Sequence, residues 1–175
     1  MKFAYLASTL LGIVSFAVAL PNIEAKQSVV TVLSTFRTTV QSIVPQIALL
    51  AESGQATEET VQPFVDEFTI AATTAAAALK GSSANGFTAA QAARLTADIF
   101  TDMANGLEIA SNAMPGNPGV GALAQGDLAS ALAMVLGGVE MVLSGVVSLV
   151  GALVSDVAEI LATLALDLLP AAPTA

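Results

Sequence analysis

The sequence predicts an all-α protein, in which a helical bundle of amphipathic helices is followed by a C-terminal hydrophobic helical hairpin. Two observations lead to this fold class. Between residues 24 and 113, apolar residues recur every three or four positions in three segments, the spacing that lines one face of an α-helix. From residue 128 to residue 169 the chain is mostly apolar and contains no Lys, Arg or His. Neither part shows the strict alternation of a half-buried strand.

The first predicted helix spans about residues 24–53. Its apolar stripe consists of Val30, Leu33, Phe36, Val40, Ile43, Ile47 and Leu50. Pro45 lies inside the stripe, and because proline lacks the backbone N–H we expect it to kink the helix or divide it. Gly54 ends the segment.

A second helix is expected over about residues 58–80. Thr57 is placed to cap it, and Glu58 and Glu59 follow where the positive end of the helix dipole favours acids. Its stripe consists of Val61, Phe64, Phe68, Ala71, Ala75 and Leu79. The following Gly- and Ser-containing stretch, residues 81–86, indicates a loop.

The third predicted helix, about residues 88–113, has the sharpest local signal in the chain. Thr88 and Gln91 match a capping box, in which each side chain bonds the other residue's backbone N–H. The helix then continues through Leu95, Ile99, Met103, Leu107 and Ala110. These three helices form an amphipathic region over residues 20–114.

A Pro- and Gly-containing linker, residues 115–127, leads into the hydrophobic helical segment 128–170, and a tail of residues 171–175 follows. A continuous helix over that segment would be about 63 Å long at roughly 1.5 Å per residue, more than a small bundle can cover. We therefore expect a bend or break near Gly137-Gly138 or near Ser144-Gly145.

The N-terminus has the features of a secretory signal peptide, residues 1–19. Lys2 supplies a positive start, Leu6 to Val18 an apolar stretch, and the small-residue site Ala17-Val18-Ala19 predicts cleavage before Leu20. The expected location is therefore secreted, extracellular or in a cell wall.

The composition excludes several classes of function. Removing the signal leaves four of the five Lys and Arg residues to face fourteen acids, a net charge of about −10, which disfavours binding to nucleic-acid phosphates. Without His or Cys the chain lacks the usual base of a nucleophilic triad and the usual ligands of zinc, copper and haem. It also lacks the GxGxxG and GxxxxGK[ST] phosphate loops. We predict no catalytic residue, no metal site and no cofactor, and hence a non-enzymatic protein.

Three interpretations of the hydrophobic segment stay open. In the first, it is a membrane span, although the charge-free stretch 141–155 is about five residues short of one. In the second, it is a buried hairpin enclosed by the earlier helices. In the third, its apolar surface is partly exposed, or becomes exposed on contact. The last two are compatible if the bundle opens at an interface. The predicted apolar contact surface consists of Val139, Val142, Leu143, Val146, Val150, Leu153, Val154 and Val157.

The function expected from this surface is non-catalytic. The protein would adsorb to apolar interfaces, with apolar surfaces or a cell-wall matrix as partners, or would self-associate. Two alternatives remain: a membrane-associated protein that inserts its C-terminal segment, and a carrier of small apolar ligands. Nucleic acid is not an expected partner.

Residues 20–114 resemble the small secreted fungal proteins of the hydrophobic-surface-binding and cell-wall mannoprotein type. The resemblance lies in the cleavable signal, the helix from Val29 to Leu50, the stretch Gly86-Phe-Thr-Ala-Ala-Gln91 and the stretch Leu95-Thr-Ala-Asp-Ile99. The C-terminal part departs from that family, and the two-part layout is similar to that of secreted basidiomycete structural proteins of aerial hyphae. The resemblance implies a surface-coating role and carries over no catalytic residue.

Overall fold

The computed structural model describes residues 27–114 and 127–154, and within these ranges every named element is a helix. The helices are α1 (Val29–Glu52), α2 (Glu58–Leu79), α3 (Ala89–Ala113), α5 (Asp127–Val142) and α6 (Val146–Leu153). The all-α class is therefore confirmed for the described residues. The predicted signal peptide and tail lie outside them, and so does the predicted linker except for its last residue, Asp127, which is the first residue of α5.

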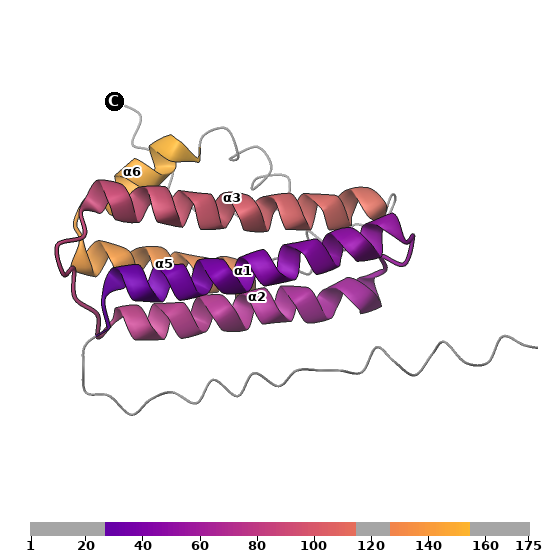
Figure 1. The fold of residues 1–175 in the computed structure, drawn as a ribbon, viewed down its shortest axis with the longest axis horizontal. Coiled ribbons are helices and arrows are strands. Elements are labelled where there is room, and N and C mark those ends of the chain that lie inside the picture. The colour runs from indigo at the N-terminus through magenta and orange to yellow at the C-terminus, as the bar shows by residue number, and fades with distance from the viewer. Residues whose placement is uncertain (1–26, 115–126, 155–175) are drawn as a thin grey trace, which may run out of the picture.

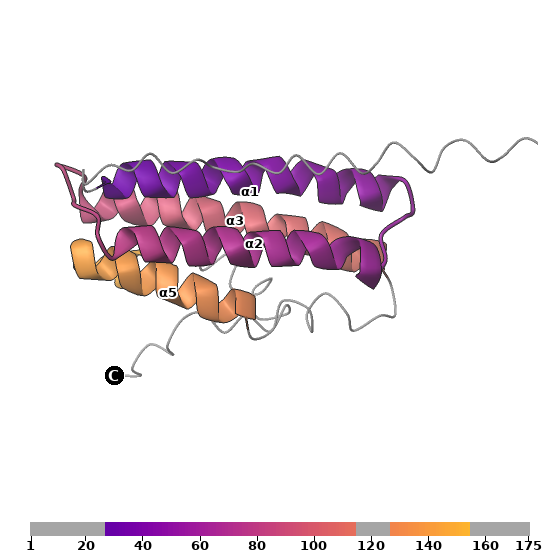
Figure 2. The same ribbon diagram turned by 90° about the horizontal axis from the view of Figure 1, so that it is seen from below.

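The helices pack side by side as a bundle (Figures 1 and 2). α2 and α3 both contact α1, α5 packs on α2, and α6 packs on α3 and on the end of α5. α1 and α3 run in one direction, and α2 and α5 run in the opposite one. The α5–α6 pair thus completes a bundle whose other three members come from the amphipathic region.

Local sequence signals account for where the first three helices begin. The Ser28 hydroxyl accepts a hydrogen bond from the Thr31 N–H at the start of α1. At the start of α2, Thr57 and Thr60 form a reciprocal capping box, and at the start of α3 Thr88 and Gln91 form the one predicted from sequence. Each cap satisfies backbone N–H groups that a helix leaves without an internal partner.

Proline does not interrupt the helices that contain it. α1 continues from Val29 to Glu52 through Pro45, so of the two effects predicted for this proline, a kink or a division, the division is wrong. Pro45 is exposed on the surface of α1, and the seven buried residues of the helix hold it to the bundle on both sides of the proline. Tertiary packing therefore outweighs the hydrogen bond that proline removes.

The loop between α2 and α3 is fixed to the start of α1 by backbone hydrogen bonds. The Ser83 N–H donates to the Gln27 carbonyl and the Val29 N–H donates to the Ser83 carbonyl, both at 3.1 Å. Asn85 and Gly86 take positive φ values of 44° and 79° to make the turn before Thr88. This contact keeps the first turns of α1 and α3 at the same end of the bundle.

The core is formed by apolar side chains from all five helices. Its largest fully buried members include Leu33 and Ile43 of α1, Phe68 of α2, Ile99 of α3 and Leu132 of α5. Two close helix contacts occur at glycines: Gly106 of α3 lies against α1, and Gly138 of α5 lies against α2. Small residues at these positions allow the backbones to approach.

The hydrophobic segment changes direction at its second glycine-containing site. α5 runs without interruption through Gly137-Gly138 and ends at Val142, and α6 begins at Val146 after Gly145, which has a φ of 89°. Of the two predicted break points, the break therefore occurs at Ser144-Gly145. A hairpin over the whole of 128–170 stays a prediction, because residues 155–170 lie outside the described part.

Candidate functional site

Charge is distributed unevenly over the bundle. Among the described residues, α1 to α3 and their loops carry Arg37, Glu52, Glu58, Glu59, Asp66, Glu67, Lys80, Arg94, Asp98, Asp102 and Glu108. α5 and α6 carry only Asp127, at the first residue of α5, and Glu140, near its end. The surface of the α5–α6 pair is therefore almost uncharged, whereas α2 and α3, the helices against which this pair packs, carry most of the acidic residues.

The α5–α6 pair also exposes large apolar side chains. We call Met134, Met141, Leu149 and Leu153 the α5–α6 apolar residues; their exposed fractions are 44%, 70%, 41% and 47%. Met134 and Met141 lie seven positions apart and so share one face of α5. The three longer helices, with 24, 22 and 25 residues, together expose four such side chains, and α5 and α6 expose the same number from 16 and 8 residues.

The structure divides the predicted apolar contact surface between core and exterior. Val139, Val146, Val150 and Val154 are buried in the core, Val142 and Leu143 are half-buried, and Leu153 is exposed; Val157 lies outside the described residues. Four of the predicted residues thus hold the α5–α6 pair to the bundle, and they can meet an external surface only if the bundle opens. Met134 and Met141, which are exposed, were not in the predicted set.

A carboxylate connects the two helices of the pair. Glu140 Oε1 accepts a hydrogen bond from the Gly145 N–H at 2.7 Å, and Oε2 accepts one from the Val147 N–H at 2.9 Å. These bonds, chiefly that from Gly145 and then that from Val147, hold the pKa of Glu140 below its ordinary value, although partial burial acts in the opposite direction. We call this arrangement the Glu140 clip.

The clip was missed in the sequence, although a signal for it exists. Glu140 is the only charged residue between Leu128 and Ser155, and it stands five residues before a glycine that starts a new helix. A lone acid at that distance can reach the free N–H groups at the helix start.

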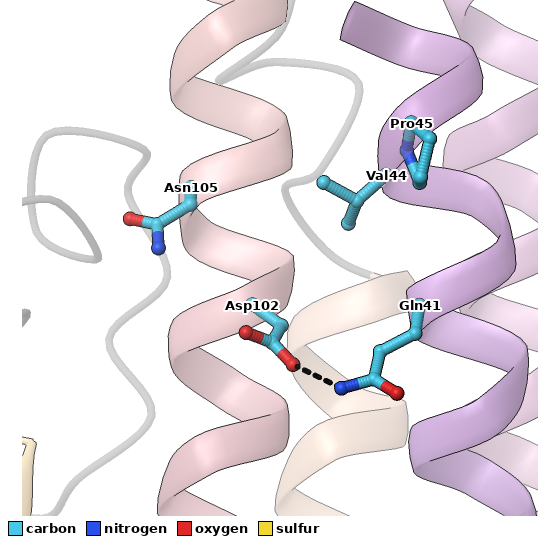
Figure 3. Close-up of a pocket in the computed structure, with 5 residues that line it drawn as sticks. All are labelled: Gln41, Val44, Pro45, Asp102 and Asn105. Carbon is cyan, nitrogen blue, oxygen red and sulfur yellow. Dashed lines mark hydrogen bonds between the residues drawn. The ribbon is translucent and has the colours of Figure 1, made fainter.

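A shallow surface depression of about 250 Å³ lies between α1 and α3 (Figure 3). It is lined by Gln41, Val44, Pro45, Asp102 and Asn105. Across it, the Gln41 side-chain amide donates a hydrogen bond of 3.3 Å to Asp102 Oδ2. Three of the five lining residues are polar and the depression is open to solvent, so it has the features of a seam between two helices and not of an enclosed ligand cavity.

The described residues hold no group of three or more acidic side chains arranged to bind a metal ion. Within the same part of the chain, none of the helices combines the length and the hydropathy that crossing a bilayer requires. No protein-family model matches the sequence, and no curated protein matches it either.

Proposed function

We propose that this chain is a non-catalytic surface protein that adsorbs to apolar interfaces, or self-associates in a cell wall or extracellular matrix, through its hydrophobic C-terminal part. The observation that carries the proposal is the coincidence of exposed apolar side chains and missing charge on the α5–α6 pair. The predicted hairpin over 128–170 is the adsorbing unit, and α5 and α6 are its described part. The secreted location belongs to the same proposal and is supported by the signal-like pattern of residues 1–19.

The physical basis is the transfer of apolar area out of water. Contact over about 1,000 Å² would contribute roughly 25 kcal/mol before the costs of ordering are subtracted. Methionine side chains suit such a contact because their unbranched thioethers adapt to irregular surfaces. The acidic helices would stay in water, so the molecule would lie on the interface in one orientation.

Lysine substitution at exposed positions tests the proposal without disturbing the core. The test variant is Met141→Lys with Leu149→Lys, and the matched control is Leu49→Lys with Ile70→Lys, two equally large exposed side chains on α1 and α2. Both variants add two positive charges, and all four substituted positions are exposed. Circular dichroism should therefore show the same helix content as in the native chain.

The readouts are dynamic surface tension at the air–water interface and depletion from solution onto polytetrafluoroethylene beads. We expect the α5–α6 variant to lose most of its adsorption and the control variant to keep it. Equal adsorption by both variants would refute the assignment to α5 and α6, and a native chain that neither adsorbs nor self-associates would refute the proposed function itself. An intact mass that begins at Leu20 in secreted material would support the location.

A further inference from the structure

α6 carries apolar side chains on its buried side and on its exposed side. Val146 and Val150 on its inner side are buried against the bundle, and Val154 is buried directly after its last turn. Leu149 and Leu153 on its outer side remain in contact with water. α6 contains no charged residue, so both sides of this eight-residue helix are apolar. A helix of this kind can be buried on its inner side by the protein or on all sides by an apolar phase.

The turn before α6 depends on a glycine and on a carboxylate from α5. Gly145 has a φ of 89°, a conformation that residues with a side chain rarely adopt. Because glycine has no side chain, the N-cap residue itself cannot cap the first N–H groups of α6. The Glu140 clip supplies the missing cap from the preceding helix, because its two oxygens bond the N–H groups of Gly145 and Val147. One carboxylate therefore ties the end of α5 to the start of α6.

We propose that α6 is a hinged flap which the Glu140 clip holds closed against α3, and whose opening presents Val146, Val150 and Val154 to an apolar phase. This inference rests on the proposed function and names the regulation of the same surface. In water the three valines favour the closed position, because leaving α3 would expose them. At an apolar interface the open position exposes no valine to water, and it adds the inner side of α6 to the contact already made by Leu149 and Leu153.

The opening can be measured in water, without any interface. The test variant is Glu140→Gln, which removes the negative charge and one acceptor oxygen but keeps the shape; the control is Glu108→Gln, the same change at an exposed carboxylate on α3. We expect hydrogen–deuterium exchange of the α6 amides to become several-fold faster in Glu140→Gln and to stay unchanged in Glu108→Gln. Exchange in α1 and α2 should keep its native rate in both.

A second measurement uses the absence of cysteine from the chain. Single-cysteine chains Val150→Cys and Leu149→Cys place a thiol on the inner and on the outer side of α6. Adding Glu140→Gln should accelerate maleimide labelling at residue 150 and leave labelling at residue 149 unchanged. Unchanged exchange in α6 together with unchanged labelling at residue 150 would overturn the flap.

Adsorption to polytetrafluoroethylene beads then links the flap to the surface. Faster adsorption of Glu140→Gln than of Glu108→Gln supports the proposal, and equal adsorption by a variant whose α6 opens faster overturns it. Failure of the flap would leave adsorption of the native chain intact. Failure of the proposed function would instead appear as a native chain that does not adsorb, so the two outcomes are distinguishable.

Discussion

Gly138 of α5 lies so close to Leu79 of α2 that a Cβ atom at residue 138 would stand 2.9 Å from the Leu79 Cβ and 3.3 Å from its Cδ1. The Ala76 carbonyl oxygen would be 3.7 Å away. Real side chains do not approach to 2.9 Å, so the seam between α2 and α5 requires a glycine at this point. The contact fixes how deeply α5 can pack against the amphipathic helices.

Two adjacent glycines should therefore respond in opposite directions to alanine. Gly138→Ala forces α5 away from Leu79, and we expect it to lower the free energy of unfolding by about 1–3 kcal/mol. Gly137→Ala meets no atom within 4 Å and gains only helix propensity, so it should raise that free energy by about 0.5–1 kcal/mol. Urea unfolding followed by circular dichroism measures both; a shift of the same sign in the two variants would contradict the close contact.

Thr96 of α3 buries a hydroxyl that has no hydrogen-bond partner among the described residues. Because an unpaired buried polar group costs free energy, Thr96→Val should stabilise the protein by about 1 kcal/mol in thermal or urea unfolding. The control is Thr69→Val on α2, whose hydroxyl donates to the Val65 carbonyl at 2.9 Å. The control should not gain stability, since the same substitution there removes a satisfied hydrogen bond. Equal effects at the two positions would argue against an orphaned hydroxyl at residue 96.

The Glu140 clip should make part of the stability depend on pH. The folded state lowers the pKa of Glu140, so the clip's contribution is complete above the unfolded value of about 4.3 and is lost as the pH falls through the lowered folded value. At pH 7 we expect Glu140→Gln to unfold more easily by about 0.5–1 kcal/mol, the usual range for a charge at a helix start.

Below the lowered pKa the native chain and Glu140→Gln should become nearly equal in stability, because the native carboxyl is then also neutral. Urea titrations at several pH values between 7 and 3 measure this convergence. Glu108→Gln controls for the loss of one negative charge from an acidic protein. A gap that stays constant down to pH 3 would show that the charge of Glu140 does not stabilise the turn.

The first three helices were predictable because their signals are local. Thr57, Thr88 and Gln91 bond N–H groups within their own first turn, and the apolar stripes repeat at a period that needs no knowledge of neighbouring helices. The sequence placed these helices at about 24–53, 58–80 and 88–113, and the structure places each of their ends within five residues of those limits.

The two glycine sites of the hydrophobic segment show where sequence reasoning stops. Gly138 and Gly145 look alike in sequence, yet the first is needed for its missing Cβ beside Leu79 and the second for its positive φ. Only the fold distinguishes these two uses of glycine. For the same reason the buried and exposed sides of 139–154 could not be assigned: both are apolar, and the buried side is set by which helix, α2 or α3, lies opposite.

Val44 of α1 and Gly106 of α3 offer a place to cross-link the bundle. A Cβ at residue 106 would stand 3.7 Å from the Val44 Cβ, within the range of about 3.5–4.5 Å that disulfides require. The chain contains no cysteine, so within one molecule the thiols of Val44→Cys and Gly106→Cys can pair only with each other. By closing the loop from residue 44 to residue 106, the bond should stabilise the oxidised protein by about 2–4 kcal/mol relative to its reduced form. Thermal unfolding with and without dithiothreitol measures the difference.

Because this bond joins α1 to α3 and leaves α5 and α6 free, the oxidised variant should still adsorb to an apolar surface. A loss of adsorption that dithiothreitol reverses would mean that α1 and α3 must separate at the interface.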